Sequence, residues 1–328
     1  MARAVGRWQI FLVVILTAAC GPVKKGAELD VYLEQFAAVK SEGGDIYLRV
    51  SSIVDEKGGE KKDERRKALE ARLEALRLID RYNRVLTGLA RGEDPKALKS
   101  EMKAVGGKLS AYHPSAQTTF AFAAAVPYLG TLVSGAGYVQ EALAKRNFIK
   151  AVHEAQKPIN AILDILLLDA APLEKVLVQQ KRKEQDPARA AVDSLAARFY
   201  RKLQTLEATA EIGVTLARHN ALRHAAGLGA IPYRPGAEAA PPKTADVEIL
   251  DTFTEEAALN LQAYRRAEGQ IAAERALFSR YLAALTAAKR ALAALNKDSE
   301  DERASATGEF NEQAMGVRQE SLRLKEAK

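Results

Sequence analysis

"LEARLEALRLIDRYNRVLTGL" (69–89) is the stretch that decides the fold class. Its apolar side chains recur at intervals of three or four residues, at Leu69, Leu73, Leu76, Ile79, Tyr82, Leu86 and Leu89. Because an α-helix has 3.6 residues per turn, this spacing gathers them on one face and leaves most charged residues on the other. The stretch therefore predicts an amphipathic helix that buries one side against other helices.

The same periodicity continues in both directions from this stretch. Residues 28–40 place apolar side chains on one helical face, whereas "DIYLRVSSIV" (45–54) is compatible with either a helix or a strand. Further along, Asp186-Pro187 has the residue types of a helix N-cap followed by a first-turn proline. We therefore expect a helix to begin there and to continue as far as Ala226, with Gly227 as its C-terminal stop.

Proline and glycine interrupt the pattern most clearly at "GLGAIPYRPGAEAAPPK" (227–243), which contains four prolines and three glycines. This composition predicts a linker over 227–245. Residues 246–296 then contain no proline and a single glycine, so we expect one helix there, roughly 75 Å long. The charged tail after it predicts a frayed helix with few residues to pack, namely Phe310, Met315, Val317, Leu322 and Leu324.

An uncharged run of 27 residues, 114–140, is unusual in so charged a chain, and a second apolar run follows at 159–173. A segment that is apolar all round is typical of a core helix covered by its neighbours, although the length of the first run would also permit a membrane span. Its content of Ala, Thr, Ser and Gly, and Pro127, favour the core. The expected fold is thus all-α, an elongated bundle of long antiparallel helices with a central uncharged hairpin.

The amino terminus carries a different pattern. Arg3 and Arg7 precede the uncharged "WQIFLVVIL" (8–16), and small residues then lead to Cys20, which is the only cysteine of the chain. A basic head, a short apolar core and a small-residue exit predict a secretory signal peptide. The apolar core is too short for a stable membrane span, which needs about 20 residues.

With Cys20 directly after "LTAA", this stretch resembles the lipobox of bacterial lipoproteins over residues 1–21. The resemblance implies that the leader, 1–19, is removed, that the Cys20 thiol receives a diacylglyceryl group, and that the new amino terminus is acylated. Residues 20–27 would then form a lipidated tether, followed by a helical bundle over 28–226. Gly21, in place of the aspartate that retains such proteins at the inner membrane, implies an outer-membrane lipoprotein facing the periplasm in a host with two membranes.

Motifs for catalysis or metal binding are scarce. None of the four histidines, His113, His153, His219 and His224, stands in a metal-binding spacing. His219 and His224 are five residues apart, so a helix turns them to different faces, and we expect surface or helix-end positions for them. The glycine-rich stretches lack the dinucleotide and P-loop patterns, and no G-x-S-x-G elbow occurs. We therefore predict no enzyme, no catalytic residue, no cofactor and no metal, with lipidation at Cys20 as the one site.

The charge of the chain is mildly basic, with 49 basic and 42 acidic residues. Removal of the leader takes away two arginines, which leaves 47 against 42, a formal charge of +5. No aromatic and basic motif for nucleic acid accompanies this charge. We expect a lipid-anchored envelope protein with a binding or scaffolding role, whose partners are the membrane, through Cys20, and a protein; residues 246–328 complete its bundle.

An alternative is a membrane-inserting bundle. Over 62–296 the pattern is loosely similar to that of α-helical pore-forming toxins, in which an uncharged hairpin lies between very long helices. That resemblance implies that residues 114–140 would enter the bilayer.

Overall fold

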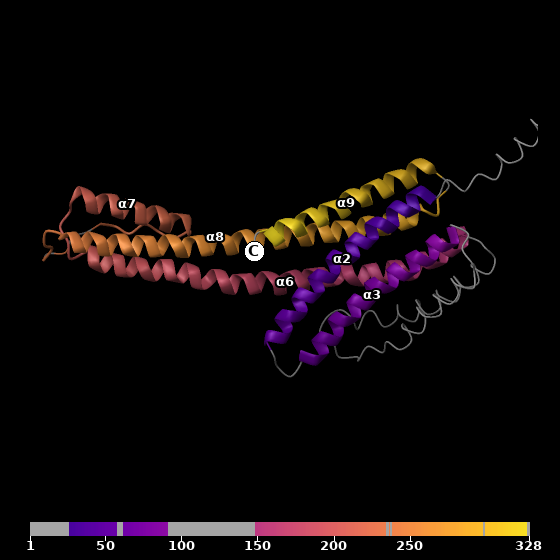
Figure 1. Cartoon of the computed structure of the whole chain (residues 1–328), viewed down its shortest axis with the longest axis horizontal. Helices are drawn as coiled ribbons and strands as arrows, with labels where there is room; N and C mark the ends of the chain where they lie inside the picture. Colours follow the sequence, from indigo (N-terminus) through magenta and orange to yellow (C-terminus); the bar gives the residue numbers. More distant parts are fainter. Residues whose placement is uncertain are drawn as a thin grey trace, which may run out of the picture. The chain divides into compact units, whose positions relative to one another are not determined.

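The computed structural model describes residues 26–57, 62–90 and 148–326, apart from 234, 235, 237 and 298. These residues form six helices and no strand, which confirms the all-α class (Figure 1). The leader with Cys20 and the uncharged segment 114–140 lie outside the described residues. None of the described helices is both long enough and apolar enough to cross a bilayer.

The described helices belong to two compact units. In chain order the helices are α2 (Gly26–Lys57), α3 (Lys62–Ala90), α6 (Phe148–Leu203), α7 (Ala210–Ala225), α8 (Thr244–Ala294) and α9 (Glu300–Glu326). Of the described residues, the first unit comprises those up to 171 together with those in 279–319, and the second comprises those in 172–278 and 320–326. Helices α6, α8 and α9 therefore each contribute residues to both units.

Helix α3 contains the stretch that predicted the fold class. Its periodic residues Leu69, Leu76, Ile79, Tyr82 and Leu86 are all buried. Helix α2 packs beside it (Figure 1), and Lys40 of α2 pairs with Asp80 of α3 at 2.8 Å. The ambiguous stretch 45–54 lies inside α2 and is helical.

The helix start expected at Asp186-Pro187 is wrong, because α6 runs through both residues. A proline inside a helix removes one backbone hydrogen bond and crowds the carbonyl four residues earlier. Here residues 181–187 are exposed or half-buried, so water can reach that carbonyl. The expected continuation to Ala226 is also wrong: α6 ends at Leu203, and α7 starts separately behind the N-cap Thr209.

The remaining helices agree more closely with the sequence. Residues 246–294 are helical throughout, as one part of α8. Gly227 has a φ of 67°, the left-handed conformation expected of a residue that ends a helix. The charged tail is helical over 300–326, and its residues Phe310, Val317 and Leu324 are buried; Met315 and Leu322, which we expected to pack, are instead exposed.

Candidate functional site

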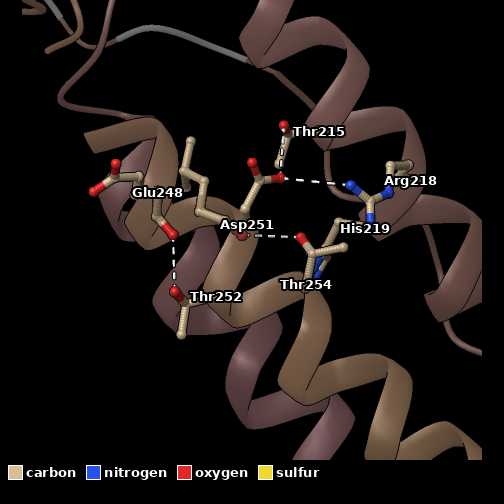
Figure 2. Close-up of polar contacts among 8 residues, drawn as sticks. Thr215, Arg218, His219, Glu248, Asp251, Thr252 and Thr254 are labelled. Carbon is tan, nitrogen blue, oxygen red and sulfur yellow. Dashed lines mark hydrogen bonds and ion pairs between the residues drawn. The ribbon is translucent and has the colours of Figure 1, made fainter. Parts of the chain in front are cut away.

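Helix α7 packs in the second unit through a face that includes buried polar side chains. Its buried residues are Ile212, Thr215 and His219, of which only the first is aliphatic. Figure 2 shows Thr215 and His219 turned towards Asp251 and Thr254 of α8. We call these four residues the α7–α8 polar cluster, and we take it as the candidate functional site because buried polar groups need a specific reason to be there.

Two flanking segments hold α7 in place. Before it, Glu207 donates its backbone N–H to the carbonyl of Ala240 at 2.9 Å. After it, Ile231 of the following loop is bound through both of its backbone groups by the side chain of Asn220 of α7. Asn220 accepts from the Ile231 N–H at 2.7 Å and donates to the Ile231 carbonyl at 3.1 Å. The described residues of the Pro/Gly-rich segment therefore fold back onto α6 and α7, and Ile231 joins their apolar core.

The surface position expected for His219 is wrong, because the residue is buried with a relative exposure of 0%. Its ring stacks on Phe199 of α6, with centroids 4.2 Å apart and planes 18° from parallel. The Thr254 hydroxyl donates to the Leu250 carbonyl at 2.9 Å, so its oxygen is left to accept from Nδ1–H of His219 at 3.4 Å. Nε2 then carries a lone pair and has no hydrogen-bond partner among the described residues.

The protonation state of His219 follows from this burial. Loss of solvent, with a smaller contribution from the nearby Arg223 guanidinium, lowers the pKa of the imidazole from 6.5 to about 4. His219 is therefore neutral at pH 7. His224 is exposed, as expected from the sequence; His153 is exposed as well, and His113 lies outside the described residues.

Asp251 completes the cluster without contacting the imidazole nitrogens. It accepts a hydrogen bond from the Thr215 hydroxyl at 3.2 Å and pairs with Arg218 at 3.7 Å (Figure 2). A Ser-His-Asp type of site needs the acid on one imidazole nitrogen and a reactive hydroxyl on the other. In this cluster the hydroxyl proton of Thr254 is committed to a backbone carbonyl, so the arrangement holds helices together and does not activate a nucleophile.

A second buried polar cluster lies in the first unit. Arg72 of α3 and Asp169 of α6 form a two-point ion pair, through Nε with Oδ2 and through Nη2 with Oδ1 at 2.8 Å. Tyr47 of α2 and Tyr281 of α8 are buried close enough for each to affect the pKa of the other, and burial raises both values, so the phenols stay neutral. Four helices thus meet around one internal ion pair.

Metal-ligating side chains do not gather in groups of three or more anywhere in the described ranges. Sequence reasoning did not identify the α7–α8 polar cluster, because histidine and threonine count as polar in a periodicity search. Their spacing was nevertheless readable, since Ile212, Thr215 and His219 follow each other at intervals of three and four, as residues on one helical face do.

The Asn220 clamp on Ile231 gives a first testable prediction. We expect Asn220→Ala to lower the free energy of unfolding by about 1–3 kcal/mol, because it leaves two backbone groups of the partly buried loop without partners. Asn260→Ala on α8 removes one local hydrogen bond to its own helix and should change stability by less than about 0.5 kcal/mol. Urea denaturation followed by circular dichroism measures both, and equal effects would contradict the clamp.

The chain matches no protein-family model, no curated protein and no solved structure. Its function is therefore inferred from its own residues and their geometry.

Proposed function

We propose that this chain is a lipid-anchored helical envelope protein that acts by binding or scaffolding, without catalysis. The observation that carries the proposal is that two prominent buried polar side chains bind partners inside the protein. Arg72 pairs with Asp169, and His219 bonds to Thr254, inside the helical packing. Because these groups stabilise the fold and face one another, the activity is assigned to the outer faces of the helices and to the attachment of the chain.

The lipobox-like residues before Cys20 support the attachment. Two or three acyl chains at this cysteine would hold the protein firmly, since burial in the bilayer contributes about 0.8 kcal/mol per methylene. Helix α2 begins at Gly26, which leaves residues 21–25 between the anchor and the helical body. In this proposal the body therefore stands close to the outer membrane and meets a protein partner in the periplasm.

Cys20→Ser tests the anchor. We expect the variant to leave the membrane fraction, or to accumulate as an unprocessed precursor, because serine cannot take the thioether-linked lipid. Mass spectrometry of the amino-terminal peptide should find acyl chains on the wild type only. Normal cleavage with full membrane retention of Cys20→Ser would contradict the anchor. Gly21→Asp serves as the matched control, since it should remain lipidated while shifting the protein towards the inner membrane.

Dye release from liposomes tests the binding or scaffolding role against membrane insertion. We expect no leakage from vesicles mixed with the full-length protein, because the proposal keeps residues 114–140 in the helical body. Leakage at a low protein-to-lipid ratio would instead favour the membrane-inserting bundle, provided that Leu129→Asp abolishes it and retains wild-type circular dichroism.

A further inference from the structure

Helix α7 is built so that it can leave the second unit without bending another helix. It is bounded by non-helical residues on both sides, at 204–209 and from 226 onwards. Its fully buried side chains are Ile212 and the polar pair Thr215 and His219, and the partly buried Leu216, Leu222 and Ala225 pack against the apolar clusters beside them. Apolar burial contributes about 25 cal/mol per Å², so α7, with 16 residues against 56 in α6 and 51 in α8, is held by less apolar area than the long helices.

The docked position of α7 favours the neutral form of His219. Protonation places a second N–H on Nε2, and that atom is buried with no acceptor among the described residues. A buried charge without a hydrogen-bonded counter-ion is strongly disfavoured. Undocking hydrates the imidazolium and removes this cost.

The carboxylates around the interface do not compensate such a charge, because arginines already hold them. Pairs of this kind include Asp193 with Arg223 at 3.0 Å, Asp251 with Arg218 at 3.7 Å, and Glu256 with Arg198 at 3.8 Å. Asp246 of α8 is likewise held, by Lys202 of α6 at 2.6 Å. The other acidic side chains along the facing stretches of α7 and α8 are exposed to solvent, namely Glu211, Glu248 and Glu255. Further titratable neighbours are the half-buried Tyr200 of α6 and Tyr233 of the following loop, and the exposed His224 of α7.

We propose that α7 is an acid-released latch: protonation of His219 detaches it from α6 and α8 while those two helices stay folded. Release uncovers the apolar side chains beneath it, which include Phe199, Leu203 and Leu250. The latch is independent of the lipid anchor, so it holds whether or not Cys20 is acylated.

The direction of the effect follows from proton linkage. The pKa of His219 is about 4 when α7 is docked and 6.5 when the imidazole is in water. The undocked form therefore binds more protons between these values, and docking weakens as the pH falls from 6.5 towards 4. From pH 7.5 to pH 5.0 the equilibrium constant for undocking should rise about 25-fold.

Hydrogen–deuterium exchange of the full-length protein at pH 7.5 and 5.0 tests the latch, once rates are corrected for the intrinsic effect of pH. Peptides from 210–225 should lose protection about 25-fold, while peptides from 246–260 of α8 change by less than about threefold. In His219→Gln the pH effect on α7 should fall below about threefold. His224→Gln, the matched control on the exposed side of α7, should behave as the wild type.

Two results would overturn the latch. One is an equal loss of protection in α7 and α8, which would mean that the unit opens as a whole. The other is a pH effect on α7 that survives in His219→Gln. If that variant does not fold, His219→Leu replaces it with an apolar side chain and the same criterion applies; if neither folds, the comparison of α7 with α8 in the wild type decides.

Discussion

Replacing Arg72 by methionine is expected to lower the free energy of unfolding by about 3–5 kcal/mol. Both partners of the Arg72–Asp169 pair are almost fully buried, with side-chain exposures of 1% and 0%. The substitution removes the guanidinium and leaves the carboxylate in a dry interior without its counter-ion. The loss is a large part of the stability of an ordinary domain, so thermal unfolding should shift by many degrees.

The double variant Arg72→Met with Asp169→Leu distinguishes the cost of an unpaired buried carboxylate from the cost of altered side-chain packing. Because it removes both charges together, we expect it to recover most of the stability lost in the single variant. Arg77→Met is the matched control on the same helix: Arg77 is 63% exposed and pairs with Glu74 at 3.3 Å, so its loss should cost less than about 1 kcal/mol. A single variant as stable as the wild type would show that the buried pair does not contribute.

Two neighbouring glycines of α2 should respond oppositely to the same substitution. A Cβ atom at Gly43 would lie 2.7 Å from Oη of Tyr281 and 3.0 Å from its ring, and that ring is buried and cannot move freely. Overpacking of this kind costs about 1–3 kcal/mol. At Gly44 the nearest atom would be 3.8 Å away, on Leu73, so alanine should stabilise α2 by about 0.5–1 kcal/mol.

Chemical denaturation of Gly43→Ala and Gly44→Ala measures this contrast. We expect the first variant to be less stable than the wild type and the second more stable. Tyr281→Phe removes the closest oxygen, so combining it with Gly43→Ala should recover part of the loss. Equal stabilisation by both alanines would mean that α2 and α8 do not approach each other at Gly43.

Regular helices could be read from the sequence because they depend on local periodicity. The stretch 69–89 lies in α3, the proline-free stretch after 245 lies in α8, and Gly227 adopts the left-handed conformation expected at a helix end. Each of these features depends on residues within a few turns of one another, so the pattern of apolar, charged and glycine residues is sufficient to predict it.

Polar residues were harder to place, because their position depends on distant partners. Arg72 lies on the predicted apolar face but its partner is 97 residues away, and His219 is buried only because Phe199 and Thr254 cover it. Sequence periodicity predicts where a helical face points but does not show which groups will face it. The expected location of the protein at the cell envelope, by contrast, rests entirely on residues 1–21 and stays a prediction from sequence.

The boundary between α6 and α7 shows the same division. The sequence by itself determined that residues 186–226 are largely helical, but it placed a start at Asp186-Pro187 and no break before Ala226. Only the tertiary structure decided that the helix passes through Pro187 and stops at Leu203, where backbone bonds to the loop at 236–240 replace the helical ones. The physical reason is that a helix continues only while each new carbonyl can bond along the helix, whereas the carbonyls of Gln204 and Thr205 accept from Gly236 and Ala240, more than 30 residues away.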